Sequence, residues 1–159
     1  MTRHRASIWW SRGDAAFSGG EYSRVHEWRF DGGAVIRASA SPQIVPAPHG
    51  DAAAVDPEEA FVAALSSCHM LWFLHLASDA GYVVDRYEDN AVGVLGKNEA
   101  GRPAVTRVTL RPKVMFGPAR APGEPELREL HHRAHEQCFL AASVLTHVEV
   151  EPQFPDVSL

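Results

Sequence analysis

Residues 56–81, DPEEAFVAALSSCHMLWFLHLASDAG, are the stretch of sequence that decides the fold. Asp56 can cap a helix, Pro57 suits the first helical position, and Glu59 completes a capping box with Asp56. A glycine closes the stretch, and glycine is typical of the position that follows a helix. We therefore predict a helix over residues 57–80.

The middle of this helix is apolar on nearly every side. Residues 61–77 carry no charged side chain, whereas a helix on a protein surface shows a single apolar stripe. The run is 17 residues long and contains two serines and two histidines, which argues against a membrane span of about 20 apolar residues. We expect a central helix that is covered by a sheet and by a second subunit, and hence a homodimer with no membrane contact.

Strands are predicted before this helix. Residues 22–30 alternate between two faces and residues 34–40 form a return strand, because the Asp31-Gly32-Gly33 segment between them is typical of a hairpin turn. Residues 42–50 contain three prolines and a glycine and therefore predict a loop.

Further strands and helices are predicted after the central helix. They are strands over residues 82–95 and 106–116, helices over residues 124–137 and 138–145, and a closing strand around residues 148–150. Strands in runs, followed by helices without a regular βαβ alternation, predict an α+β fold.

Length, composition and charge are those of one soluble domain. The 159 residues, 45% of them apolar, are enough for a buried core. We expect a single domain over residues 1–159, with N-terminal strands within 4–40, the central helix, and C-terminal strands and helices within 82–152. The net charge of −5 argues against nucleic-acid binding, which rests on a basic surface. The basic start, residues 1–5, is followed by no apolar signal core, so we expect a cytoplasmic protein.

The chain contains two cysteines, Cys68 and Cys138. In a reducing cytosol a pair of thiols is more often catalytic, redox-active or metal-binding than a structural staple. An inert core cysteine is one alternative, because free cysteine is among the most buried residue types. A zinc site is another, because His131 and His135 are four residues apart near Cys138, and Cys68 or His69 could complete the ligand set.

Three features of the sequence carry a family resemblance, and they are the helix start Asp56-Pro57-Glu58-Glu59, Cys68 ten residues after Glu58, and Cys138-Phe139 followed by Ala141-Ala142-Ser143. With these features the chain resembles the OsmC/Ohr family, the osmotically inducible and organic hydroperoxide resistance proteins. The resemblance covers about residues 22–152. It indicates an atypical branch, because the usual sequence context of the family's thiolate-binding arginine is not recognisable.

The resemblance implies an OsmC-like fold, in which an intertwined homodimer places antiparallel sheets around central helices. It also implies thiol-dependent reduction of organic hydroperoxides to alcohols, as part of an oxidative stress response. Cys68 would attack the peroxide, Cys138 would resolve the resulting sulfenate as a Cys68–Cys138 disulfide, and Glu58 would be the carboxylate partner. An external dithiol reductant would restore both thiols, and no cofactor or metal would be needed.

The arginine that holds the thiolate is chosen from the strand pattern. Arg24 lies on the same predicted strand face as Trp28 and Phe30, so it points toward a core or an interface and needs a partner there. Arg37 is expected in solvent. We therefore select Arg24 as the catalytic arginine, with Arg37 and Arg12 as alternatives.

Helix geometry bears on how the thiol is activated. Free cysteine has a pKa near about 8.5, and Cys68 is too far along its helix for the helix dipole to lower that value. A guanidinium beside the sulfur is the expected substitute. Glu58 and Cys68 are ten residues apart, which is about 15 Å along a helix axis. Glu58 therefore serves Cys68 through a bridging arginine or from the antiparallel helix of a partner subunit, and we favour the partner subunit.

Apolar side chains near the nucleophilic cysteine favour organic peroxides over hydrogen peroxide, and they are Phe61, Leu65, Met70 and Trp72. The two-thiol mechanism requires the fold to bring the cysteines together, since a disulfide needs Cα atoms within about 7 Å. The alternatives to the peroxidase are a non-catalytic OsmC-like dimer, which binds a ligand or has a structural role, and a zinc-binding protein.

Overall fold

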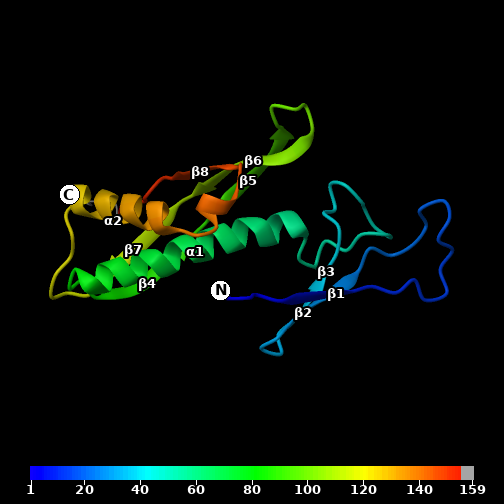
Figure 1. Ribbon diagram of the computed structural model, residues 1–159, viewed down its shortest axis with the longest axis horizontal. Helices are drawn as coiled ribbons and strands as arrows, with labels where there is room; N and C mark the ends of the chain where they lie inside the picture. Colours follow the sequence, from blue (N-terminus) through cyan, green and yellow to red (C-terminus); the bar gives the residue numbers. More distant parts are fainter. Residues whose placement is uncertain (155–159) are drawn as a thin grey trace. The chain divides into compact units, whose positions relative to one another are not determined.

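The computed structural model describes residues 1–154, and Figure 1 labels the helices and strands. In chain order the elements are β1 (Ala6–Trp9), β2 (His26–Phe30), β3 (Val35–Ala38), α1 (Pro57–Asp79), β4 (Val84–Asp89), β5 (Val92–Lys97), β6 (Pro103–Leu110), β7 (Pro112–Phe116), α2 (Glu124–Gln137), the 3-10 helix η1 (Ala141–Ser143) and β8 (His147–Val150). This order confirms the predicted α+β fold.

The chain divides into two compact units. The N-terminal unit comprises residues 1–60, and the C-terminal unit begins at Phe61. That the two units form a single domain stays a prediction, and the last residues assigned to that domain, 155–159, lie outside the described residues.

The N-terminal unit is built on an antiparallel hairpin. β2 pairs with β3, and β1 pairs with the other edge of β2. Gly33 lies in the turn with φ +87°, a conformation that glycine adopts without steric cost. The predicted hairpin is confirmed, but its first strand begins at His26 rather than at Tyr22. The reason is that Tyr22 stacks on Phe17, with ring centroids 4.7 Å apart, instead of extending the strand.

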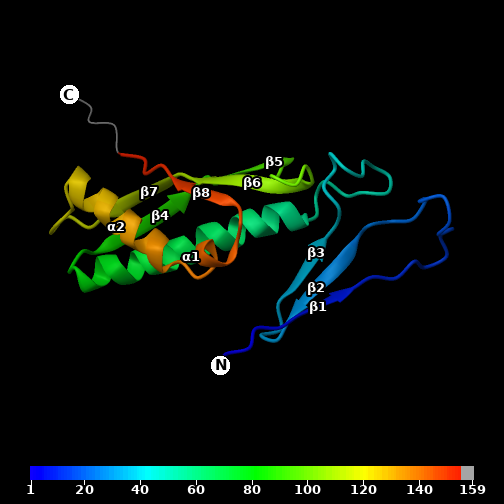
Figure 2. The same ribbon diagram turned by 45° about the horizontal axis from the view of Figure 1, so that its top comes forward.

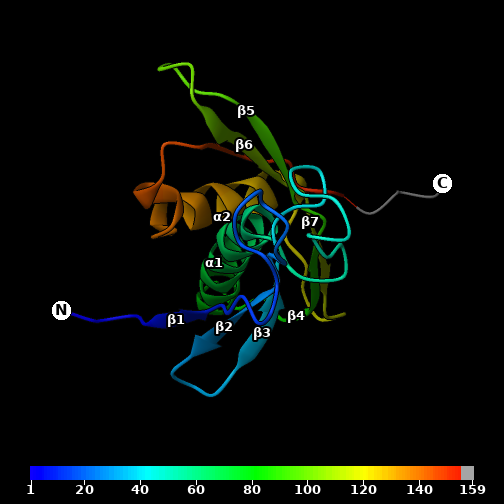
Figure 3. The same ribbon diagram turned by 90° about the vertical axis from the view of Figure 1, so that its right-hand side faces the viewer.

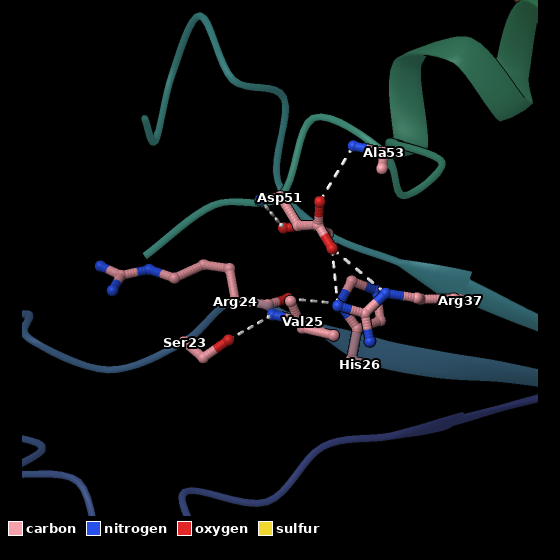
Figure 4. A network of polar contacts seen from close by, with 8 residues as sticks. Ser23, Arg24, Val25, His26, Arg37, Asp51 and Ala53 are labelled. Carbon is pink, nitrogen blue, oxygen red and sulfur yellow. Dashed lines mark hydrogen bonds and ion pairs between the residues drawn. The ribbon is translucent and has the colours of Figure 1, made fainter. Parts of the chain in front are cut away.

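The proline-rich loop after β3 is held by polar contacts, which Figure 4 shows. Arg37 pairs with Asp51, with 2.6 Å between Nη2 and Oδ2. Asp51 also accepts a hydrogen bond from the Ala53 N–H at 2.9 Å, and its own N–H donates to the Ser39 hydroxyl at 3.1 Å. The Arg37 guanidinium and the Ala53 N–H hold the pKa of Asp51 below its usual value. These contacts join β3 to the chain just before α1.

α1 begins and ends where its sequence predicts. Asp56 Oδ1 accepts a hydrogen bond from the Glu59 N–H at 2.7 Å, and Glu59 Oε2 accepts one from the Asp56 N–H at 3.2 Å, so the capping box is formed. The helix ends two residues before Gly81, which has φ +78°. The Tyr82 N–H donates to the Ala77 carbonyl at 2.9 Å and satisfies a carbonyl of the last turn.

α1 is long and apolar enough to cross a membrane by length and composition alone, and 28% of its most apolar window is buried inside the structure. The core helix of a soluble protein can have the same length and composition. Figures 2 and 3 show α2 and the C-terminal sheets on one side of α1. Its buried side chains are Leu65, His69, Phe73, Leu76 and Ala77. Elsewhere on the helix Leu71 remains 60% exposed, which leaves apolar surface for a partner.

The strands after α1 are shorter than predicted. The sequence indicated one strand over residues 82–95 and another over 106–116, and both predictions are wrong, because the first is β4 and β5 and the second is β6 and β7. β4 pairs with β7, and β5 pairs with β6, which also pairs in parallel with β8. Asp89 fixes the first break. Its carboxylate accepts hydrogen bonds from the Ser66 hydroxyl at 2.5 Å and from the Arg111 N–H at 2.6 Å.

The core of the C-terminal unit lies between α1, α2 and the sheets. One cluster joins Phe73 of α1 to Leu127 of α2 and to side chains of β4 and β7. A second joins Leu65 of α1 to Val108 and Leu110 of β6. α2 has the bounds that the sequence predicts. The core therefore fixes which side of α1 is buried and which side is left for a functional site.

The capping box at the start of α1 provides a test of the fold. We expect Asp56→Ala to lower the free energy of unfolding by about 1 kcal/mol, because an N-cap side chain and its hydrogen bond are lost. Chemical denaturation measures the change. Glu99→Ala, in the exposed turn after β5, is the control and should change stability by less than about 0.5 kcal/mol. An Asp56→Ala protein as stable as the original would contradict this account of the helix start.

Candidate thiol site

Cys68 lies on α1 beside an open apolar pocket of about 660 Å³. Its side chain is half-buried. The pocket is lined by one side of α1 and by the segment after α2, and these residues are Ala64, Ser67, Cys68, Leu71, Trp72, His75, Phe139 and Leu140. Trp72 and Phe139 meet edge to face, with ring centroids 5.5 Å apart and planes at 90°. An apolar ligand can therefore reach the Cys68 thiol through this pocket.

Most of the apolar side chains that were predicted to lie around Cys68 do not line its pocket. Leu65 is 1% exposed in the core, and Phe61 packs against the same cluster. Of the four predicted side chains, Trp72 lines the pocket. Leu71 and His75 also line the pocket and were missed. Leu71 lies three residues after Cys68 and His75 lies seven residues after it, so helical spacing places them on the same side of α1. No local signal pointed to Phe139 and Leu140, which come from another part of the chain.

Cys138 lies immediately after α2, where the helix ends. It is 1% exposed. Its N–H donates to the His135 carbonyl at 3.2 Å, and its Sγ accepts a hydrogen bond from the Ala141 N–H at 3.4 Å. The helix predicted over residues 138–145 is reduced to the short η1, because the chain turns here to carry Phe139 toward Trp72. Cys138 is therefore held by its turn in a fixed, buried position.

The structure brings the two free thiols together. Burial and, to a smaller degree, the neighbouring Cys68 side chain raise the pKa of Cys138 to about 11, and both thiols are free. The two cysteines, 70 positions apart in sequence, are thus neighbours in the fold, as the two-thiol hypothesis requires. The Cα separation of about 7 Å needed for a disulfide stays a prediction.

Glu58 lies in the first turn of α1 and is half-buried. It belongs to the same helix as Cys68, ten residues earlier, which corresponds to about 15 Å along the axis. A glutamate side chain cannot span this distance within one chain. The neighbouring Glu59 completes the capping box, so Glu58 is the carboxylate of this turn that remains for another role.

The three candidate arginines all lie in the N-terminal unit. The Arg24 guanidinium donates to the Tyr22 carbonyl and lies over the Tyr22 ring, with Cζ 3.8 Å from the ring centroid. Arg37 pairs with Asp51 and its side chain is 62% exposed, as expected. Arg12 is exposed and donates to a carbonyl of its own loop. The approach of Arg24 to the thiol pair stays a prediction.

Two buried histidines lie between α1 and α2. His69 Nε2 and His131 Nδ1 are 3.0 Å apart, and the two rings are nearly parallel at 7°. Phe73 stacks on His131 with ring centroids 4.2 Å apart. Burial lowers the pKa of His69 to about 4, with a smaller effect of nearby His135, and lowers the pKa of His131 to about 3, with a smaller effect of His69. Both rings are therefore neutral at physiological pH.

The zinc site considered from the sequence finds no support in this arrangement. Across residues 1–154 no group of three or more histidine, cysteine or acidic side chains is placed to hold a metal ion.

The two thiols should differ in reactivity toward an alkylating agent such as iodoacetamide. We expect Cys68 to be modified first, because it lines the open pocket, while Cys138 is buried and, with a pKa of about 11, is thiolate in only about one molecule in 10⁴ at pH 7. Mass spectrometry of peptides after a short exposure measures the order. Labelling in denaturant, where both thiols are exposed, is the control. Faster modification of Cys138 in the folded protein would contradict this description.

The histidine pair should make stability depend on pH. Unfolded histidine has a pKa near about 6.5, so between about pH 6.5 and 4 the unfolded chain binds more protons than the folded protein. The free energy of unfolding should therefore fall as the pH falls, by up to about 1.4 kcal/mol per pH unit for each histidine. Denaturation from about pH 7 to pH 4.5 measures this slope.

Matched variants identify the source of the slope. His131→Gln should give a shallower slope, whereas Tyr87→Phe should keep it. Burial raises the pKa of Tyr87, so this side chain stays protonated throughout the range. Equal slopes in His131→Gln and the original protein would show that the buried pair does not titrate as described.

Comparison with known proteins relates this geometry to other chains. A family model described as OsmC-like protein matches residues 49–153. The solved structure of an OsmC-like protein of unknown function from Vibrio cholerae is 54% identical, with a TM-score of 0.94, and the match covers 96% of this chain and 100% of that one. No curated protein matches the chain.

More distant structures share the fold. An organic hydroperoxide resistance protein from Elizabethkingia anophelis is 18% identical, with a TM-score of 0.68, over 96% of this chain and 94% of that one. The organic hydroperoxide resistance protein OhrB of Bacillus subtilis is 19% identical, with a TM-score of 0.66, over 96% of this chain and 98% of that one.

Proposed function

Because the chain belongs to the OsmC-like family, we propose that it reduces organic hydroperoxides to alcohols with Cys68 and Cys138 as a redox pair. The observation that carries the proposal is the position of the thiols, which are neighbours, with Cys68 facing an open apolar pocket. The shared fold of two organic hydroperoxide resistance proteins supports the same class of activity.

The proposed reaction has three balanced steps. The Cys68 thiolate attacks a peroxide oxygen, the O–O bond breaks, a sulfenic acid forms on Cys68, and the departing alkoxide takes up a proton to become the alcohol. The Cys138 thiol then attacks the sulfenic sulfur, which forms the disulfide and releases water. An external dithiol reduces the disulfide to two thiols and is itself oxidised to a disulfide.

The environments of the two thiols fit different roles. Cys68 is half-buried at the pocket and can meet a ligand. Cys138 is buried, and its raised pKa keeps it protonated and unreactive toward peroxide at neutral pH. A thiol that is close to Cys68 but slow to react alone suits the resolving step, in which the partner is an adjacent sulfenic acid rather than a diffusing peroxide.

The pocket favours substrates with an apolar group. Leu71, Trp72, Phe139 and Leu140 supply its walls, and burying an alkyl group contributes about 0.8 kcal/mol per methylene. Three or four buried methylenes therefore give a preference on the order of a hundredfold for an organic hydroperoxide over hydrogen peroxide.

In this proposal Arg24 supplies the positive charge that stabilises the Cys68 thiolate, and Glu58 of the partner subunit orients the guanidinium. The separation of about 15 Å between Glu58 and Cys68 along one helix favours a shared site. The exposed apolar surface of α1, including Leu71, favours a homodimer. The protein would act in the cytoplasm without a cofactor.

Counting free thiols tests the reaction. One equivalent of cumene hydroperoxide should remove two thiols from the reduced protein, and dithiothreitol should restore both. Cys68→Ser should abolish peroxide reduction, because the nucleophile is lost. Cys138→Ser should permit one turnover and then leave Cys68 open to sulfinic or sulfonic oxidation. Mass mapping identifies the disulfide and the oxidised sulfur.

Two outcomes would overturn this assignment. A protein that keeps both thiols after treatment is a non-catalytic, ligand-binding relative, and an undiminished rate in Cys68→Ser places the chemistry elsewhere. Equal rate constants for cumene hydroperoxide and hydrogen peroxide would remove the substrate preference alone.

A further inference from the structure

A second pocket, of about 260 Å³, lies between α2 and β8 and shares no lining residue with the Cys68 pocket. Figure 2 shows β8 running beside α2. The polar lining of the pocket comes from α2 and consists of Arg128, His131, His132 and His135. Val148 and Val150 of β8 form the apolar wall. These polar side chains carry N–H donors, and no carboxylate lines the pocket. The donor set is that of an anion site.

His131 is the buried member of this set. It is 2% exposed, and its Nε2 has no hydrogen-bond partner within residues 1–154. His135 lies one helical turn later on the same side of α2, and within the same part of the chain its Nδ1 also has no partner. Buried polar atoms are normally hydrogen-bonded. Both residues line the pocket, and each carries a buried nitrogen that a polar ligand could satisfy.

The bond to His69 determines what His131 can offer. A neutral imidazole carries one N–H and one bare nitrogen. When His69 Nε2–H donates to His131 Nδ1, across 3.0 Å, the proton of His131 lies on Nε2, which becomes a hydrogen-bond donor. In this tautomer a ligand with acceptor oxygens satisfies His131, and its binding selects the tautomer of both rings.

Arg128 gives the pocket its permanent positive charge. Its Nε and Nη2 donate to Glu124 Oε1 at 3.0 and 2.8 Å. A guanidinium has five N–H groups, so three remain for another acceptor. Both side chains of the ion pair with Glu124 are exposed, and an exposed ion pair contributes little binding energy. Arg128 can therefore turn to another anion at small cost.

We propose that the pocket between α2 and β8 binds a small oxyanion, a carboxylate or a phosphate group, through Arg128, His131 Nε2–H and His135. The buried histidine pair then connects this anion site to α1, on which His69 follows Cys68 directly. The site is separate from the thiol chemistry and stands whether or not the protein reduces peroxides.

Isothermal titration of the full-length protein tests the proposal, with phosphate, acetate and succinate as separate probes in chloride buffer of constant ionic strength. We expect saturable binding at one site for at least one probe. Arg128→Gln and His135→Gln should each raise the dissociation constant by about tenfold or more, because a charge-assisted hydrogen bond is lost. His147→Gln, on the exposed start of β8 and outside the pocket, should leave binding unchanged.

Nitrogen NMR of the histidine rings gives a second readout that does not require a His131 variant to fold. On binding, the chemical shift of His131 Nε2 should move toward that of a protonated ring nitrogen, and the chemical shift of His131 Nδ1 should move toward that of an unprotonated one. Binding of phosphate alone or of carboxylates alone supports the site and identifies its ligand. The proposal is overturned by absence of saturable binding up to about 10 mM, by equal affinities in the pocket variants and the control, or by binding of Zn²⁺ in place of any oxyanion.

Discussion

The structure depends on burying one side of a helix that is apolar on nearly every side. Leu65, Phe73 and Leu76 of α1 are each at most 5% exposed, and burial of such side chains contributes about 1.5–3 kcal/mol each. α2 and the C-terminal sheets cover this one side of the helix. The apolar surface that they leave carries Cys68 and forms a wall of its pocket. One helix thus supplies side chains to both the core and the candidate site. A rotation of α1 about its axis would therefore disturb both.

The buried side of α1 is not wholly apolar, and this departure carries information. His69 and His131 are almost fully buried, and a nitrogen of each lacks a hydrogen-bond partner within residues 1–154. An unsatisfied buried polar atom costs about 1–3 kcal/mol, so apolar side chains of similar size would make a more stable core. Natural sequences depart from such rules mainly at functional positions. The pair is therefore better explained by a ligand or a coupling role than by stability.

Signals that act within a few residues were readable from the sequence. The capping box of Asp56 and Glu59 and the glycine after α1 are local interactions, and they gave the bounds of α1 to within one residue. The breaks between β4 and β5 and between β6 and β7 were missed. Asp89, at the first break, bonds to Ser66 and Arg111, each more than twenty positions away, so its contacts are not local signals. The parallel pairing of β6 with β8 is also a long-range contact.

The same distinction holds for the candidate site. The sequence indicated Cys68 and Cys138 by their residue type and by family resemblance, and it could have given Leu71 and His75 by helical spacing from Cys68. It could not give Phe139, because the turn after α2 that brings this ring against Trp72 is fixed by tertiary packing.

The remaining question for the thiol site is one of charge. Cys68 lies beyond the reach of the α1 dipole, and the residues that line its pocket include no arginine or lysine. A thiolate that attacks peroxides at neutral pH needs a stabilising cation. For the proposed chemistry that cation is either a protonated His75, the one basic side chain of the pocket lining, or a guanidinium from outside that lining, such as the proposed Arg24.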